Sequence, residues 1–146
     1  EIIEFQPEYD GTDIGEALRY LTNAIKKRCT AFLLSDMIDV DEEGMPVYED
    51  ALKVAVNRHN LSVIQVYDPR ERTLPDVGLV HIKDSESGRA AWVDTSSKKM
   101  RQAYSKWFST FREASSRMFM KYKVDSVEIA TDQDYVRNLM AFFQKR

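Results

Sequence analysis

Thr12 and Asp36 are the two side chains whose types and positions best fit a chemical role in this chain. Thr12 lies in a loop just before a predicted helix, and Asp36 directly follows a short apolar run that predicts a strand. Ligands of open parallel sheets bind outside the carboxyl ends of the strands. We therefore expect this hydroxyl and this carboxylate to share one edge of a sheet, where they could contribute to a ligand site.

The segment that joins these two residues predicts a helix and a buried strand. Asp13 or Thr12 fits the N-cap position, because a short oxygen-bearing side chain accepts hydrogen bonds from the first helical N–H groups. Glu16 completes a capping box with Asp13. Residues 14–25 carry apolar side chains at helical spacing, and residues 30–34 form the continuous apolar run of a strand that is covered on both faces.

A second unit of the same kind follows along the chain. Residues 47–59 predict a helix and residues 61–67 predict a β-branched strand, so the chain contains a strand–helix–strand unit that is parallel by default. Asp68 follows this strand and is expected at the same edge of the sheet as Asp36. Arg70 is expected either to pair with Asp68 or to receive an acidic partner.

The rest of the chain predicts a hairpin, two helices and one more strand. Residues 78–94 form two short strands around a glycine-containing turn, which we interpret as an antiparallel appendage at the sheet edge. The other elements are a helix over residues 97–122 capped by Thr95 or Ser96, a strand over residues 125–130, and a final helix with Tyr135, Leu139, Phe142 and Phe143 facing inward. The predicted fold class is α/β, an open and mainly parallel sheet with flanking helices and a β-hairpin appendage.

Composition excludes several classes of function. The 146 residues fit one domain, residues 1–146, and an apolar content of 43% suits a globular core. With 21 basic and 24 acidic residues the net charge is −3, so the charge favours neither nucleic acid nor an anionic membrane. No apolar run approaches the roughly 20 residues of a membrane span. Cys29 is the single cysteine, which agrees with a reducing, cytoplasmic compartment.

The sequence has no recognised catalytic motif. His59 and His81 have no Ser or Cys nearby in a known nucleophile context. Zinc-ligand spacings, the HExxH motif and a glycine-rich phosphate loop are absent as well. We therefore expect a protein that is not an enzyme.

The sequence around Thr12 and Asp36 resembles von Willebrand factor A-like domains. Residues 11–18, GTDIGEAL, and residues 33–36, LLSD, look like the second and third metal-site motifs of these domains. Residues 66–75, which include VYDPRE and LP, are similar to the uncharacterised bacterial family of such domains that is encoded beside MoxR-type AAA+ ATPases. The resemblance implies a Rossmann-type fold with Thr12 and Asp36 as Mg²⁺ ligands, and an AAA+ ATPase as a protein partner.

The first metal-site motif of those domains, Asp-x-Ser-x-Ser, is absent from this sequence. The resemblance therefore implies the carboxyl-terminal portion of a longer domain, whose amino-terminal strands are missing and whose metal site this chain half supplies. Without a neighbouring strand, the apolar strand at residues 30–34 has an unpaired edge. We therefore expect this fragment to self-associate.

Three functions remain open. The first is a protein-interaction module, an adaptor for a MoxR-type ATPase in protein assembly or maturation. In it a cation at Thr12 and Asp36 receives a partner's carboxylate, and Asp39, Asp68 and Arg70 contact the partner. The second is a receiver-like domain, in which Asp36 accepts a phosphoryl group and Asp39 or Asp68 holds magnesium. The third is a structural domain without a metal site. We favour the first, because a shallow site of hard oxygens suits Mg²⁺.

Overall fold

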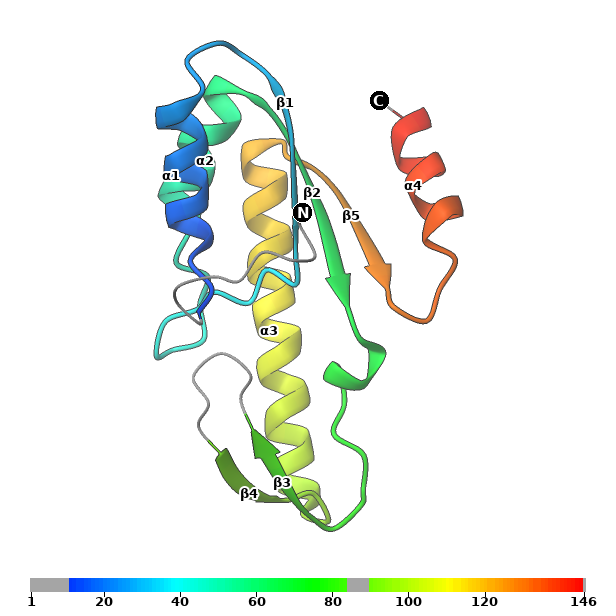
Figure 1. The fold of residues 1–146 in the computed structure, drawn as a ribbon. Coiled ribbons are helices and arrows are strands. Elements are labelled where there is room, and N and C mark those ends of the chain that lie inside the picture. Colours follow the sequence, from blue (N-terminus) through cyan, green and yellow to red (C-terminus); the bar gives the residue numbers. More distant parts are fainter. Residues whose placement is uncertain (1–10, 84–89, 146) are drawn as a thin grey trace.

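The structure is a computed structural model that describes residues 11–83 and 90–145 (Figure 1). The turn of the predicted hairpin lies outside the described residues. In chain order the elements are α1 Ile14–Ala24, β1 Thr30–Ser35, α2 Glu49–Arg58, β2 Asn60–Tyr67, the short helix η1 Pro69–Glu71, β3 Leu79–Lys83, β4 Ala90–Asp94, α3 Lys98–Tyr122, β5 Asp125–Ala130 and α4 Tyr135–Gln144.

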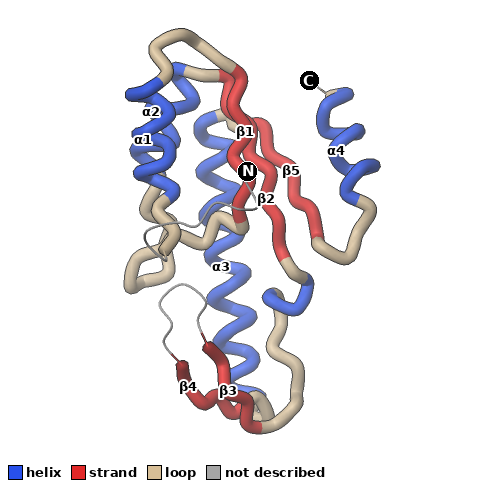
Figure 2. Tube along the Cα trace, in the orientation of Figure 1, coloured by secondary structure: helices blue, strands red, loops and turns tan. Residues whose placement is uncertain are grey.

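The central sheet has three parallel strands in the order β1-β2-β5 (Figure 1). Helices α1, α2 and α3 lie on one side of this sheet and α4 lies on the other (Figure 2). The antiparallel β3–β4 hairpin forms a sheet of its own beside the first turns of α3. The predicted α/β class, the parallel unit and the hairpin appendage are confirmed, but the hairpin is not an extension of the central sheet.

The hydrophobic core lies between the sheet and the layer of α1, α2 and α3. Leu33 of β1 and Val63 of β2 are register partners, and both contribute to this core because side chains alternate between the two faces of a strand. The buried members of the cluster are Ile14, Leu18, Met37, Tyr48, Ala51, Leu52, Ala55, Leu61, Val63, Phe111, Met118, Phe119 and Val124. This one core holds the edge of the sheet where the candidate site lies.

Strand β1 is not covered on both faces, so that prediction is wrong. Phe32 and Leu34, on the face away from the core, are 45% and 62% exposed. Within the described part of the chain, α4 is the helix on that face, and it reaches β1 through an edge-to-face contact between Phe143 and Phe32 at 5.6 Å. An apolar run in the sequence therefore marks a strand here, but not how completely neighbouring elements cover it.

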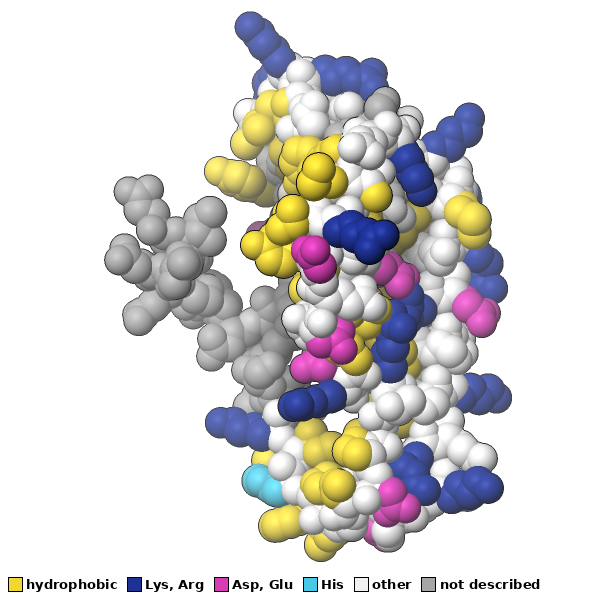
Figure 3. Space-filling model, turned by 90° about the vertical axis from the view of Figure 1, so that its right-hand side faces the viewer, with side chains coloured by type: hydrophobic (Ala, Val, Ile, Leu, Met, Phe, Trp, Pro, Cys, Tyr) yellow, Lys and Arg dark blue, Asp and Glu magenta, His cyan; other side chains and the backbone are white. Residues whose placement is uncertain are grey.

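Helix α4 packs loosely on the sheet. Two of its predicted inward residues, Tyr135 and Phe143, are 61% and 45% exposed, whereas Leu139 and Phe142 are half-buried. A mostly apolar cavity of about 250 Å³ lies between α4 and the sheet, lined in part by Leu34. Figure 3 shows apolar side chains gathered near the top of this face and again at its lower end, with charged side chains between them.

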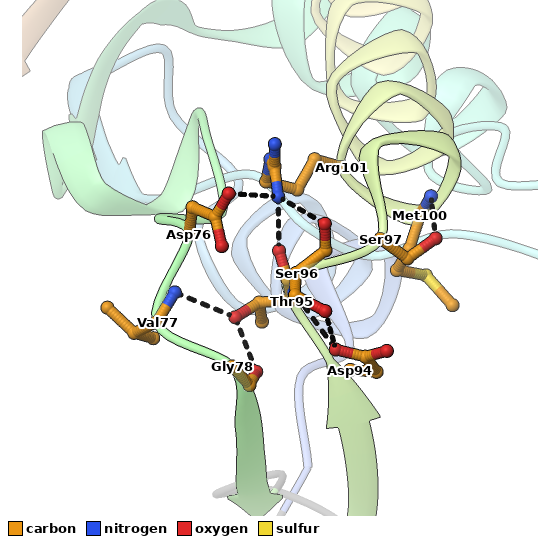
Figure 4. A network of polar contacts seen from close by, with 9 residues as sticks. All are labelled: Asp76, Val77, Gly78, Asp94, Thr95, Ser96, Ser97, Met100 and Arg101. Carbon is orange, nitrogen blue, oxygen red and sulfur yellow. Dashed lines mark hydrogen bonds and ion pairs between the residues drawn. The ribbon is translucent and has the colours of Figure 1, made fainter.

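The first turn of α3 is capped by Ser97, whose Oγ accepts a hydrogen bond from the Met100 N–H at 3.4 Å. The predicted cap Thr95 has another role (Figure 4). Its side chain is buried, accepts from the Val77 N–H at 3.2 Å and donates to the Gly78 carbonyl at 2.6 Å. Thr95 therefore closes the base of the hairpin rather than capping the helix.

A guanidinium group fixes the hairpin to α3. Arg101 Nη1 donates to the carbonyl oxygens of Thr95 and Ser96, at 2.5 and 2.9 Å, and forms an ion pair with Asp76 at 3.0 Å (Figure 4). These contacts bring the two ends of the hairpin to the same turn of α3. The position of the hairpin thus depends on backbone groups, which a side-chain pattern in the sequence does not reveal.

The hydroxyl of Tyr48 is buried at the centre of the core. It lies 3.4 Å from both the Met37 carbonyl and Ser115 Oγ. The pKa of Tyr48 is raised to about 12, mainly because the hydroxyl is buried. The negative charges of Asp39 and Asp36 add to this rise, and the hydrogen bond with Ser115 opposes it. The folded protein therefore holds this proton more tightly than the unfolded chain does.

We expect the stability of the protein to fall as the pH rises from 10 to 12, because the unfolded chain loses the Tyr48 proton first. This ionisation should lower the free energy of unfolding by about 2–3 kcal/mol. Urea unfolding of the wild type and of Tyr48→Phe across this range measures the difference. Tyr20→Phe, at a residue that is 74% exposed, is the control and should keep the wild-type slope.

Candidate functional site

The loops before α1 and after β1 meet at the carboxyl end of the sheet. The Ile14 N–H donates a hydrogen bond to Asp39 Oδ2 at 2.9 Å, which joins the first turn of α1 to the loop that follows β1. Asp13 caps the helix as predicted, because its Oδ1 accepts from the Glu16 N–H at 2.5 Å. Thr12 directly precedes this cap and is half-buried. The residues around Thr12 and Asp39 therefore lie at one edge of the molecule.

Asp36 is exposed and is oriented by a tight turn. Its Oδ1 accepts hydrogen bonds from the Ile38 N–H at 3.0 Å and from Ser35 Oγ at 3.3 Å. Ser35 Oγ in turn accepts from the Met37 N–H at 3.0 Å. Met37 has a φ of 65°, in the left-handed region, and its side chain is fully buried. The buried Met37 thus fixes the turn that presents the Asp36 carboxylate to solvent.

The candidate cation ligands at this edge are the hydroxyl of Thr12 and the carboxylate of Asp36. Within residues 11–83 and 90–145, no three His, Cys, Asp or Glu side chains come close enough together to hold a metal ion. In the same residues, no hydrogen bond reaches Oδ2 of Asp36. Mg²⁺ takes six oxygen ligands and commonly keeps several waters. The Thr12 hydroxyl and the Asp36 carboxylate are oxygen ligands of the kind that Mg²⁺ prefers.

The loop from Asp39 to Val47 is stabilised by hydrogen bonds between its own residues. Asp41 Oδ1 accepts hydrogen bonds from the N–H groups of Glu43 and Met45, both at 2.9 Å. Gly44 has a φ of 78° and lies against the indole of Trp107 on α3. This packing holds the loop beside α3 and so helps to position Asp39.

Asp68 and Arg70 follow β2 but do not pair through their side chains. Asp68 Oδ1 accepts from the backbone N–H of Arg70 at 2.8 Å, and Glu71 Oε2 accepts from the Asp68 N–H at 3.3 Å. Together these bonds are a capping box for η1. Asp68 is therefore a cap in this structure, and Arg70 is exposed at the start of the following loop.

A charged cluster that the sequence did not reveal lies at this edge. We call it the arginine cluster: Tyr67, Arg72, Arg112 and Glu128. The guanidinium groups of Arg72 and Arg112 lie 3.8 and 5.5 Å from the centre of the Tyr67 ring. Both guanidinium groups also contact one oxygen, Oε2 of Glu128. The sequence feature that points to this cluster is Arg112, a charged residue beside the apolar stripe of α3.

Strand register explains how the arginine cluster reaches Asp36. Ser35, Gln65 and Glu128 are register partners across the three parallel strands, so they form a polar row on the face that α3 covers. A small cavity of about 20 Å³, close to the size of one water molecule, lies at this level. Its lining residues are Asp36, Gln65, Tyr67, Phe108, Phe111, Arg112 and Glu128. Asp36 and the arginine cluster are therefore two parts of one surface.

A thiol–imidazole contact lies at the opposite, amino-terminal end of the strands. Cys29 Sγ is 3.3 Å from Nδ1 of His59, and His59 is buried. This contact is remote from Asp36, because residues 29 and 36 flank the two ends of β1. It does not contribute to the candidate site.

None of the helices in the described residues is both long enough and apolar enough to span a membrane.

No solved structure matches the chain. Curated relatives are found in mycobacteria. An uncharacterised protein of Mycobacterium avium is 26% identical over 136 residues, covering 92% of this chain and 76% of the relative. Uncharacterised proteins of Mycobacterium bovis and Mycobacterium tuberculosis are equally similar over 92% of this chain, which spans only 40% of their length. The printed names of these relatives give no enzymatic activity.

A family model covers most of the chain. The model described as "Protein of unknown function DUF58" matches residues 1–114, which include both candidate ligands, Thr12 and Asp36, and the first three members of the arginine cluster. Because this match extends over far more than half of the sequence, the chain belongs to the DUF58 family.

Proposed function

We propose that this chain is part of a protein-interaction module that uses a divalent cation, Mg²⁺ in the first instance, at the carboxyl edge of its sheet. Thr12 and Asp36 contribute ligands, water and other oxygens complete the shell, and a partner carboxylate takes an open position. The observation that carries the proposal is the 2.9 Å hydrogen bond between the Ile14 N–H and Asp39, because it joins the loops that bear the two ligands.

The identity of the module and of its partner comes from the resemblance in sequence. We propose that the module is von Willebrand factor A-like and that its partner is a MoxR-type AAA+ ATPase, for which it serves as an adaptor in protein assembly or maturation. The exposed Asp36 carboxylate and the parallel strand order β1-β2-β5 support this proposal. A receiver-like role needs a second carboxylate for magnesium, yet Asp39 and Asp68 each accept a backbone N–H hydrogen bond. For this reason we place the interaction module first.

A paramagnetic metal tests the site directly. With Mn²⁺ as the probe and ¹⁵N-labelled protein, we expect the amide signals of residues 12–14 and 36–39 to broaden, while those of α4 stay sharp. Excess Mg²⁺ should restore the signals by competition, because both ions prefer hard oxygen ligands. Asp36→Asn removes one anionic ligand oxygen. The variant should need at least about ten times more Mn²⁺ than the wild type to reach the same broadening.

Asp41→Asn is the matched control, because Asp41 is also an exposed loop carboxylate whose Oδ1 accepts two backbone N–H bonds. It should leave the broadening at residues 12–14 and 36–39 unchanged. Equal broadening in the wild type and in Asp36→Asn would refute the metal site. A Mg²⁺-dependent pull-down of the ATPase by the wild type, lost in Asp36→Asn, would then support the partner.

A further inference from the structure

The arginine cluster has more hydrogen-bond donors than acceptors. Each guanidinium group carries five N–H donors, so Arg72 and Arg112 offer ten between them. The described ion pairs of both groups converge on one oxygen, Oε2 of Glu128. Nε of Arg72 is buried and has no hydrogen-bond partner among the described residues. This arrangement leaves capacity for a further acceptor.

The geometry of the cluster favours a planar anion. Arg72 stacks on Tyr67 at 3.8 Å, which fixes the plane of its guanidinium group and directs the N–H donors sideways. A carboxylate matches the fork of such a group and forms two parallel hydrogen bonds with it. Glu128, whose side chain is 41% exposed, already shows that a carboxylate fits between the two arginines.

Glu128 is held weakly enough to share the site. The side chains of Arg72, Arg112 and Glu128 are 37%, 28% and 41% exposed, and ion pairs at such exposure contribute little to stability because water competes for both charges. An external carboxylate therefore gives up little binding free energy when it displaces Glu128 or binds beside it. Removing the negative charge of Glu128 should then strengthen the binding of an anion.

We infer that Arg72, Tyr67 and Arg112 form a carboxylate-binding site, with Glu128 as its internal and replaceable occupant, and that the ligand is an acidic segment of a protein partner. The inference rests on the proposed function for the biological partner, because Asp36 and Arg112 line the same small cavity. The site itself needs no metal. One acidic side chain of the segment binds the two arginines, while a neighbouring one faces Asp36 and its cation.

A peptide titration in the presence of EDTA separates this site from the metal site. The probe is a hexaglutamate peptide, with hexaglutamine as its uncharged counterpart, and the readout is the ¹⁵N–¹H signals of the arginine Nε groups. Hexaglutamate should shift the signals of Arg72 and Arg112, and hexaglutamine should not. Glu128→Gln should bind hexaglutamate about tenfold more tightly, and Arg112→Gln about tenfold more weakly.

Glu113→Gln is the matched control, since it removes the same charge from another ion pair, the one that Glu113 forms with Arg117 on α3 at 3.7 Å. It should leave the affinity as in the wild type. If Arg112→Gln does not fold, Arg112→Lys decides, because it keeps the charge and loses the planar fork; weaker binding supports the site and unchanged binding opposes it.

Several results would overturn the inference. Equal affinity of Glu128→Gln and Glu113→Gln for hexaglutamate would contradict it, and so would wild-type affinity in Arg112→Gln. A shift of the two arginine signals by inorganic phosphate, without one by hexaglutamate, would contradict it as well. Asp36→Asn should leave peptide binding in EDTA intact or slightly stronger. Loss of Mn²⁺ broadening with intact peptide binding would therefore count against the metal site alone, and the reverse would count against the arginine cluster alone.

Discussion

Phe111→Ala is expected to destabilise the protein by about 3–5 kcal/mol, the usual cost of truncating a large buried aromatic side chain. Phe111 is 1% exposed, belongs to the core cluster and is stacked against Trp107 with ring centres 6.2 Å apart. Phe111 also lines the small space that Asp36 lines, so its truncation enlarges that space. Urea or thermal unfolding followed by circular dichroism measures the loss.

Met120→Ala is the control for this truncation, because Met120 lies on the same helix and is 70% exposed. It should change the stability by no more than about 0.5 kcal/mol. A loss below about 1 kcal/mol for Phe111→Ala would show that the site collapses around the smaller side chain. Helix α3 would then pack much more loosely against the sheet than the 1% exposure of Phe111 indicates.

Gly44→Ala is expected to destabilise the protein by about 2–5 kcal/mol, from a left-handed backbone that costs about 1–2 kcal/mol and from overpacking of about 1–3 kcal/mol. The φ of Gly44 is 78°, and a Cβ there would lie 2.5 Å from Nε1 of Trp107. Either the indole or the loop must move. Because the loop carries Asp39, the hydrogen bond from the Ile14 N–H should weaken as well, and the Ile14 amide should exchange faster.

Gly78→Ala separates the two contributions. Gly78 has a similar φ of 82°, but nothing lies within 4 Å of the place where its Cβ would stand. The stability lost in Gly78→Ala should be limited to the cost of the left-handed backbone, about 1–2 kcal/mol. The excess loss in Gly44→Ala then measures the contact with Trp107. Equal losses in the two variants would mean that the indole moves aside freely and does not position the loop.

The sequence alone determined the local structure of this protein and its class. Asp13 was recognisable as a cap, and the strand at residues 125–130 has the bounds that its composition indicated. The parallel pairing of β1 and β2 followed from the helix between them. These features depend on residues a few positions apart, so periodicity and capping rules reach them. The proximity of the loops near Thr12 and Asp36 was expected for another reason, because loops at the carboxyl ends of parallel strands share one edge of the sheet.

Only the tertiary structure decided which surfaces are covered and which charges meet. Phe32 and Leu34 read as core residues, but their exposure depends on how far α4 extends over the sheet. Arg72, Arg112 and Glu128 converge because a loop, the middle of helix α3 and strand β5 lie at the same level, and no local pattern encodes that distance. Ion-pair partners in proteins are selected by packing between distant segments, which is why the arginine cluster appears only in the folded molecule.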